Sequence, residues 1–197
     1  MVLIFLLVFC QSLEEYSGDS SGLSISYYSI IKLQHESSKL YLSSLGVLYV
    51  NGSNQQMTRG INKGILSETF WSVYPLPNES FINQGEPVQC GSEVRFKHSV
   101  TGKFLHSHQI EGPFGHGYEV SVFNGNDSGD YWTIECGDIW SVSSSIHIQH
   151  SDTKMYLSAN LNNEYKEEQG GGFEIFSDDI SDNNEWSVQG GLFVGEE

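Results

Sequence analysis

Two histidines stand one residue apart in "TGKFLHSHQI", residues 101–110, and His116 follows a few positions later. Imidazole binds transition metals and serves as a general base, so His106 and His108 would suit a metal clamp or the base of a hydrolase. Alternate residues of a β-strand face the same way, so an ordinary piece of sheet gives the same spacing. The choice among these interpretations depends on the elements that hold the pair.

The segment that carries the pair belongs to a unit that occurs three times. In "IKLQHESSKLYLSS", "VRFKHSVTGKFLHSH" and "IHIQHSDTKMYLSA", apolar residues alternate with polar ones up to a histidine. This period of two predicts a strand with one buried face, and the Ser, Thr, Asp and Gly that follow favour a hairpin turn. A leucine comes seven residues after each histidine, and a tryptophan comes 36, 34 and 36 residues after it. The recurring positions are His35, His98 and His150; Leu42, Leu105 and Leu157; and Trp71, Trp132 and Trp186.

The threefold repeat predicts the architecture. With 21 glycines, many serines and asparagines, and no long stripe of period 3.6, the sequence favours short strands joined by turns. Propellers normally need four or more repeats, and a solenoid of three would need caps at both ends. We expect an all-β protein, a β-trefoil with pseudo-threefold symmetry, as one domain over residues 29–197. Its repeats would span about 29–83, 84–138 and 139–197.

The repeats also bear on the histidines. A buried imidazole must pair both ring nitrogens, so we expect each of His35, His98 and His150 to tie a turn to its strand. The alternative is that the three converge on one metal ion. The position of His106 is a serine in the other two units, so the fold does not require histidine there. We therefore expect His106 and His108 to form a polar surface site for a partner or ligand.

Exposed aromatic residues would suit the same purpose. Phe114 and Tyr118 follow the histidine pair, and Tyr165 occupies a loop of the third unit. Such residues could form an aromatic platform for a sugar; packing within a loop is the alternative.

The charge excludes some partners. Nine Lys and Arg against 25 Asp and Glu give a formal charge of −16. A surface that negative repels nucleic acid and anionic membranes. The "SDDISDNNEW" segment matches no calcium loop and is expected to be a solvated acidic turn. No hydrolase elbow, zinc-protease helix motif or phosphate-binding loop occurs, which argues against an enzyme and names no cofactor.

Several features indicate the secretory pathway. Residues 1–18 begin with an apolar run too short to span a bilayer, and we expect a signal peptide there, followed by a flexible leader at 19–28. A buried N-terminal strand is the alternative. Sequons for N-glycosylation begin at Asn51, Asn78 and Asn126. Beyond the leader, no apolar stretch reaches membrane-spanning length.

The cysteines agree with this. Cys10 lies in the expected leader, which leaves Cys90 and Cys136 in the mature chain. Two cysteines far apart, without a CxxC motif, favour one structural disulfide over a zinc or redox site. Two buried free thiols are the alternative.

The unit resembles the MIR motif, and the chain resembles the stromal cell-derived factor 2 family. The segments that carry the resemblance, in the same order, are "VQCGSEVRFKHSVTGKFLHSH", "GYEVSVF", "DYWTIEC" and "SSSIHIQHSDTKMYLS". It covers roughly residues 28–195. The resemblance implies a non-catalytic protein of the endoplasmic-reticulum lumen that works in folding quality control, with a J-domain co-chaperone, the lumenal Hsp70 and misfolded clients as partners. A module that binds mannosylated or other glycans is the alternative.

Two departures from the family pattern qualify this expectation. Members of the family commonly end in a KDEL-like tetrapeptide, whereas this sequence ends in "GGLFVGEE". Retention would then rely on a partner, or the protein would be secreted, or the natural chain would continue past Glu197. The match is also loose around "RGINKGILSETFW" in the first repeat.

Overall fold

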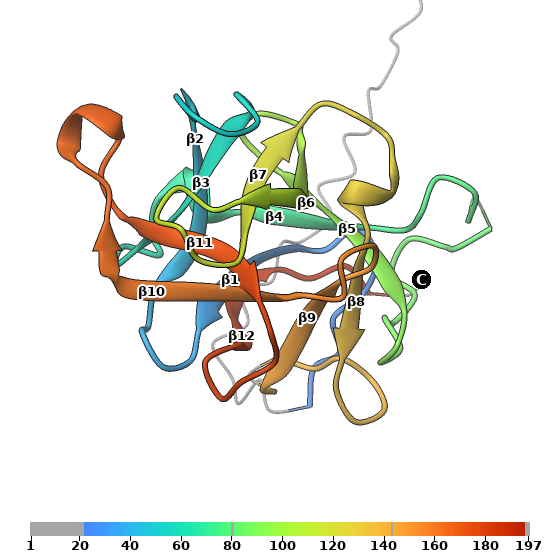
Figure 1. Ribbon diagram of the computed structural model, residues 1–197. Coiled ribbons are helices and arrows are strands. Elements are labelled where there is room, and N and C mark those ends of the chain that lie inside the picture. The colour runs from blue at the N-terminus through green and yellow to red at the C-terminus, as the bar shows by residue number, and fades with distance from the viewer. Residues whose placement is uncertain (1–21, 80, 143, 196–197) are drawn as a thin grey trace, which may run out of the picture.

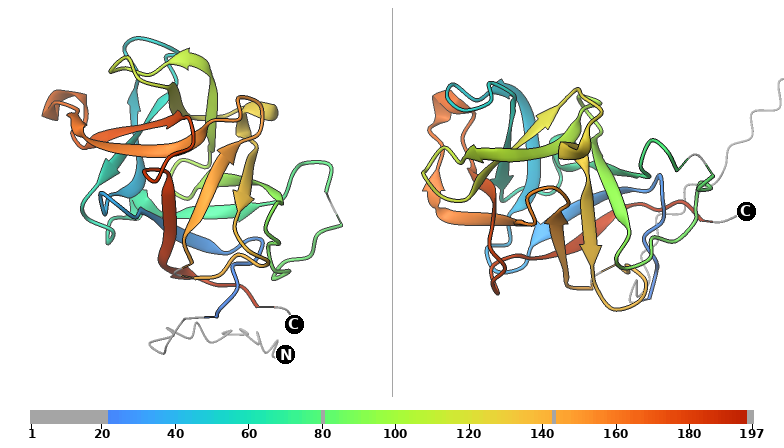
Figure 2. Two further views of the ribbon diagram at one scale, coloured as in Figure 1. Left: turned by 60° about the horizontal axis from the view of Figure 1, so that its bottom comes forward. Right: turned by 45° about the vertical axis from the view of Figure 1, so that its right-hand side comes forward.

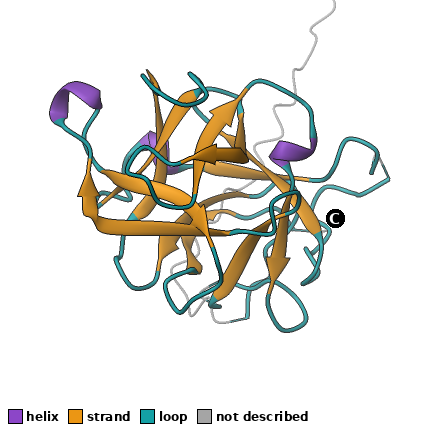
Figure 3. Ribbon diagram, viewed as in Figure 1, coloured by secondary structure: helices purple, strands orange, loops and turns teal. Residues whose placement is uncertain are grey.

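The computed structural model describes residues 22–79, 81–142 and 144–195, and their fold is all-β (Figure 1). Strands dominate and three short 3₁₀ helices interrupt the loops (Figure 3). The strands are β1 (Ile30–His35), β2 (Tyr41–Leu48), β3 (Gln56–Ile61), β4 (Trp71–Tyr74), β5 (Glu93–His98), β6 (Phe104–Glu111), β7 (Tyr118–Phe123), β8 (Trp132–Glu135), β9 (Ile146–His150), β10 (Tyr156–Glu164), β11 (Phe173–Asp178) and β12 (Glu185–Leu192). The 3₁₀ helices are η1 (Ser67–Thr69), η2 (Ser128–Asp130) and η3 (Glu167–Gln169).

The strand pairing forms a closed ring and a cap. β1 pairs with β4, β4 with β5, β5 with β8, β8 with β9, β9 with β12, and β12 again with β1. The remaining strands form the hairpins β2–β3, β6–β7 and β10–β11, and these meet through β3–β7, β7–β11 and β11–β3 pairs. A closed ring leaves no long exposed edge for another chain to pair with. β1 and β12 lie side by side and bring the two ends of the described chain together (Figure 2).

The first strand of each set of four follows the expected alternation. β1 and β5 bury every second residue, and β9 does the same in "IHIQH". Their apolar side chains point into the ring because successive residues of a strand face opposite sides. The interpretation of these segments as half-buried strands is therefore confirmed.

The second strand of each set behaves differently. β2, β6 and β10 each bury three consecutive residues after their first, including Leu105, His106 and Ser107 in β6. Three buried residues in a row break the period of two, because both faces of the strand are covered where the ring meets the cap. This double cover determines where His106 lies.

The tryptophans that close each set fill the core. Trp71, Trp132 and Trp186 are fully buried, as are the three repeated leucines. Each indole Nε1–H donates to a leucine carbonyl: Trp71 to Leu42 and Trp132 to Leu105 at 3.0 Å, and Trp186 to Leu157 at 2.8 Å. Pairing the indole N–H removes the penalty of burying a polar group, so the ring can keep its large side chains inside.

The structure corrects the expected leader. The signal peptide expected at 1–18, with Cys10, lies outside the described residues. Within the described part, residues 22–28 are not a flexible leader, because Ile25 and Tyr27 are buried in the core. The Ile25 backbone also pairs with Trp140 and Val88 at 2.8 Å. Apolar burial and backbone pairing fix this segment against the ring.

The expected disulfide is present. Cys90 and Cys136 are joined, with a Cα–Cα distance of 5.2 Å, and the bond closes the chain around β5 to β8. The alternative of two free thiols is wrong. Among the described residues, no helix has the length and apolar character needed to cross a membrane.

Candidate functional site

The three repeated histidines are buried, and each has both ring nitrogens paired. Nδ1 accepts from a hydroxyl three residues later: Ser38 for His35, Thr101 for His98 and Thr153 for His150, at 2.7–3.0 Å. Nε2–H donates to a backbone carbonyl just before a tryptophan: Asn183 for His35, Glu68 for His98 and Gly129 for His150, at 2.8–3.1 Å. No nitrogen of these three side chains is left for a metal ion.

Burial also fixes the charge of these histidines. Desolvation lowers the pKa of His35 and His98, and it lowers the pKa of His150 to about 4. All three imidazoles are therefore neutral at pH 7, and their role is structural.

His106 is not on the surface, contrary to the expectation. Its side chain in β6 is only 1% exposed, and Nδ1–H donates to Oδ1 of Asp130 at 2.9 Å. Asp130, the last residue of η2, is itself fully buried. The other polar atoms of the pair, Nε2 of His106 and Oδ2 of Asp130, have no hydrogen-bond partner within the described part of the chain.

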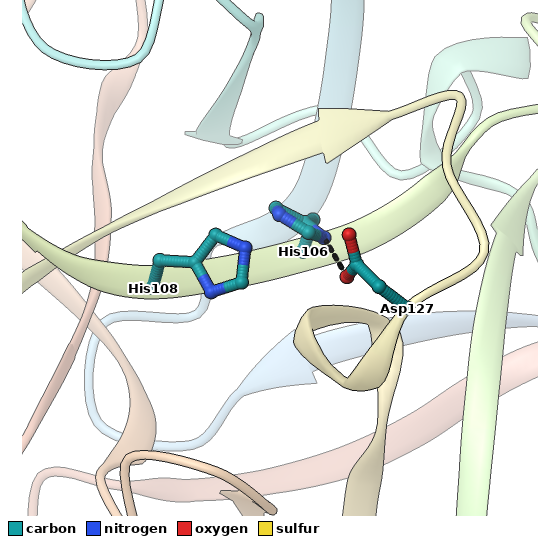
Figure 4. A group of neighbouring side chains, drawn as sticks. All are labelled: His106, His108 and Asp127. Carbon is teal, nitrogen blue, oxygen red and sulfur yellow. Dashed lines mark ion pairs between the residues drawn. The ribbon is translucent and has the colours of Figure 1, made fainter.

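His108 and Asp127 lie beside His106 and form a cluster with it (Figure 4). His108 lies two residues further along β6 and is partly exposed, and its ring meets that of His106 edge-on with centroids 4.4 Å apart. Oδ1 of Asp127 lies 3.7 Å from Nδ1 of His106. One possible ligand atom from each of His106, His108 and Asp127 lies within 4.8 Å of the others. The arrangement places two imidazoles and two carboxyl groups close together, with His106 and Asp130 buried and His108 and Asp127 towards the surface.

The loop before Trp132 positions the carboxylates. Asp127 is the N-cap of η2, and its Oδ1 accepts from the Gly129 N–H at 3.0 Å. The two imidazole rings pack so closely against the backbone that only glycine fits at position 129. A Cβ there would lie 2.4 Å from Cε1 of His106 and 2.7 Å from Cε1 of His108. The Gly129 carbonyl is the acceptor for His150, so the repeated histidine of the third unit also anchors this loop.

The neighbouring charged groups leave the cluster acidic. Arg95 donates to the side chain of Asn126 at 3.1 Å and lies over the ring of Phe104, and no ion pair joins it to Asp130 in the described chain. Asp152 accepts from Ser128 at 2.5 Å on the outer side of η2. Asp127 and Asp130 bring two carboxyl groups to the cluster, and Arg95 is the nearby cation.

The other two units lack the cluster. Ser43 and Ser158 occupy the position of His106, and Thr69 and Asn184 occupy that of Asp130, two residues before the tryptophan. In the third unit the Asn184 amide donates to the Ser158 hydroxyl. The second unit thus has a histidine and a carboxylate where the third unit has a neutral polar contact.

Sequence reasoning missed Asp127, Gly129 and Asp130. The available signal was "NDSGDYW", where a carboxylate stands at a position that is Thr and Asn in the other units.

The remaining candidate residues lie elsewhere. Phe114 occupies the loop between β6 and β7 and is 37% exposed, and Tyr118 begins β7 opposite Glu111. These residues stand at the far end of the hairpin from His106. Tyr165 is 4% exposed and packs against Phe114, so its expected role as an exposed aromatic is wrong.

The sequon asparagines and the acidic turn are open to solvent. Asn51, Asn78 and Asn126 are exposed, as are Asp179 and Asp182 in the turn between β11 and β12. Two other carboxylates, Glu119 and Glu174, are buried, and desolvation raises the pKa of each. Glu119 accepts from Ser53 and Glu174 from Asn163, so both hold loops in place.

Comparison with known proteins identifies the family. No family model matches the sequence. The stromal cell-derived factor 2-like protein of Arabidopsis thaliana is 34% identical over 165 residues, which cover 81% of this chain and 75% of that protein. The chain belongs to the stromal cell-derived factor 2 family. A crystal structure of the SDF2-like protein from Arabidopsis thaliana matches this member of the family with a TM-score of 0.83 at 32% identity, over 88% of this chain and 98% of that one.

A more distant structure shares only the fold of this stromal cell-derived factor 2 family member. It is the S. cerevisiae protein O-mannosyltransferase Pmt1-Pmt2 complex bound to the sugar donor. The TM-score is 0.72 at 20% identity, over 93% of this chain and 29% of that one.

Proposed function

We propose that this protein is a non-catalytic component of folding quality control in the lumen of the endoplasmic reticulum. It binds a J-domain co-chaperone and, through it, the lumenal Hsp70 and misfolded clients. The observation that carries the proposal is family membership over most of the chain, in a fold that matches nearly the whole of the plant relative. The absence of recognisable catalytic motifs in the sequence fits a binding role.

The proposal includes the architecture as a β-trefoil of three MIR repeats, at about 29–83, 84–138 and 139–197. The six-stranded ring, the three hairpins of the cap and the three equivalent tryptophan–leucine contacts support it. A threefold framework offers three sets of loops at its surface, and these can diverge while the core stays the same.

The proposed compartment follows from the covalent chemistry. The Cys90–Cys136 disulfide persists in an oxidising environment such as the lumen. Residues 1–18 serve as the signal peptide in this proposal, and the exposed Asn51, Asn78 and Asn126 are available to glycosylation.

An acidic pocket is the surface that best suits a protein partner. This open pocket of about 530 Å³ is lined by Glu79, Glu86 and Glu93 together with apolar and small polar residues. Phe81 lies at it with 76% of its surface exposed. Negative charge beside an exposed aromatic ring suits a basic segment that carries apolar side chains.

Affinity capture from the cells that produce the protein tests this proposal. The tagged wild-type chain should recover the lumenal Hsp70 and a J-domain protein, identified by mass spectrometry. Phe81→Ser should reduce that recovery at least fivefold. Phe114→Ser, at the other exposed phenylalanine, is the matched control and should leave it unchanged. Recovery of neither chaperone by the wild type, under conditions that preserve other lumenal complexes, would refute the proposal.

Glycan binding is the second candidate. The observation that favours it is the exposed ring of Phe114, held in place by its contact with Tyr165, since a fixed aromatic face can pack against a sugar ring. A glycan array that includes mannosylated peptides tests it. Binding that Phe114→Ser abolishes and Phe81→Ser preserves would support this candidate, and an array without signal at high protein density would remove it.

A further inference from the structure

The cluster around His106 is incomplete as a hydrogen-bonded network. Asp130 is a buried carboxylate with one oxygen on His106 and the other without a partner in the part of the chain described. An unpaired buried polar atom costs about 1–3 kcal/mol, and more when the group is charged. A buried carboxylate in this state calls for an explanation, and a bound ion is one.

The distances in the cluster suit a small cation. Metal bonds of about 2.0–2.1 Å in a tetrahedral zinc site separate the ligand atoms by about 3.3 Å. Nδ1 of His106 lies 2.9 Å from Oδ1 of Asp130 and 3.7 Å from Oδ1 of Asp127, on either side of that value. His108 contributes a ring nitrogen within 4.8 Å of the ligand atoms of His106 and Asp127. Shifts of about 1–2 Å would bring the ligand atoms of His106, His108 and Asp127 to zinc spacing, and Asp130 adjoins them through His106.

The charge and the type of the donors select the ion. Two imidazoles and two carboxylates suit Zn²⁺ and neighbouring divalent transition metals, whereas Ca²⁺ and Mg²⁺ prefer oxygen ligands alone. Two carboxylates would balance the two charges of the ion. His150, which faces the loop, is neutral at pH 7 and adds no repulsion.

The site also has an entrance. His106 and Asp130 are buried, but His108 is partly exposed and the Asp127 side chain is 51% exposed. An ion can therefore reach the two outer ligands first and the two inner ones afterwards. The Gly129 backbone leaves room for both imidazoles, because a side chain there would collide with them.

We propose that His106, His108, Asp127 and Asp130 bind one divalent transition-metal ion, with Zn²⁺ the best match. When the ion binds Nδ1 of His106, the neutral ring carries its proton on Nε2 instead, and the hydrogen bond from Nδ1 to Asp130 is replaced by the two metal bonds. The other two units hold serine at the position of His106, so the protein has one such site and not three. The inference is independent of the proposed chaperone and glycan roles.

Zinc titration of the full, disulfide-bonded protein tests the inference. The protein is first dialysed against a chelator, and ZnCl₂ is then added in competition with a chromophoric chelator. One Zn²⁺ should bind per chain. His108→Gln and Asp127→Asn should each weaken binding at least tenfold. Asn keeps the capping oxygen of Asp127, so this variant removes the charge and leaves η2 intact.

Matched controls separate the cluster from general surface binding. His116→Gln and Asp179→Asn change an exposed histidine and an exposed aspartate outside the cluster, and both should bind Zn²⁺ like the wild type. The ring protons of His106 and His108 should shift in NMR spectra with one equivalent of Zn²⁺, while those of His116 stay in place. Lack of stoichiometric binding, or equal loss in controls and cluster variants, would overturn the proposal.

Discussion

The repeated histidines and the His106 cluster use the same side chain in opposite ways. His35, His98 and His150 occur once per unit, and each is saturated by a hydroxyl and a carbonyl. His106 occurs in one unit, faces a buried carboxylate and has one nitrogen without a partner among the described residues. Both kinds are buried, so burial alone does not distinguish a structural histidine from a candidate site.

The difference lies in how completely the hydrogen bonds are made. An imidazole with both nitrogens hydrogen-bonded has no free nitrogen for a ligand, and His35, His98 and His150 share this environment. An unsaturated imidazole beside an acid carries a cost that the fold does not need, because serine fills the same position in the other units. The three repeated histidines have both nitrogens paired and His106 does not, and this difference, together with the neighbouring carboxylates, makes His106 the candidate site.

The largest loss of stability is expected when one of the repeated core tryptophans is removed. Trp71→Ala and Trp132→Ala should each lower the free energy of unfolding by about 3–5 kcal/mol, since both remove a buried indole and its hydrogen bond. Urea denaturation should give values that agree within about 1 kcal/mol, as expected for equivalent positions. Losses that differ by more than this would show that the units are not energetically equivalent.

The repeated histidines should give the protein a marked acid sensitivity. A lowered folded-state pKa means that the unfolded chain binds protons first, so stability falls as the pH drops from about 6.5 towards 4. For His150 alone the loss is about 3 kcal/mol. Glu119 and Glu174 act in the opposite sense, because their raised pKa values favour the folded state once they are protonated.

Unfolding measured across this pH range checks the assignment. His150→Gln should flatten the dependence between pH 4 and 6.5, whereas His116→Gln, at an exposed site, should not. If both variants keep the wild-type slope, the acid sensitivity does not come from the repeated histidines.

A conversion of the second unit into the third tests the cluster. His106→Ser alone leaves Asp130 buried without its donor and should cost about 2 kcal/mol. Adding Asp130→Asn recreates the Ser158–Asn184 contact of the third unit and should recover most of that loss. Thermal or urea unfolding measures the stability of both variants. A double variant less stable than the single one would contradict the equivalence of the His106–Asp130 and Ser158–Asn184 positions.

The smallest effect on stability is expected at the outer ligand. Asp127→Asn should change the unfolding free energy by less than about 0.5 kcal/mol, because asparagine caps a helix as well as aspartate does. The same variant should lose zinc affinity. A large loss of stability would assign Asp127 to the framework instead.

The sequence predicted the framework because each of its signals is local. Alternation marked the strands, and the histidine-to-tryptophan spacing marked the unit. The pairing of His106 with Asp130 could not be predicted in this way, because the two are 24 residues apart and meet only when η2 folds back over β6. His106 was misplaced on the surface because period-two reasoning assumes one open face, and β6 is covered on both where it begins.

The carbonyls that accept from the repeated histidines have a consequence for the whole chain. His98 bonds to the loop of the first unit, His150 to that of the second, and His35 to that of the third. The donors and acceptors thus form a closed cycle in which each unit is locked by the next and none comes first. A single unit cut from this cycle would lose one partner on each side. Three units are therefore the smallest number in which every one of these histidine hydrogen bonds is made.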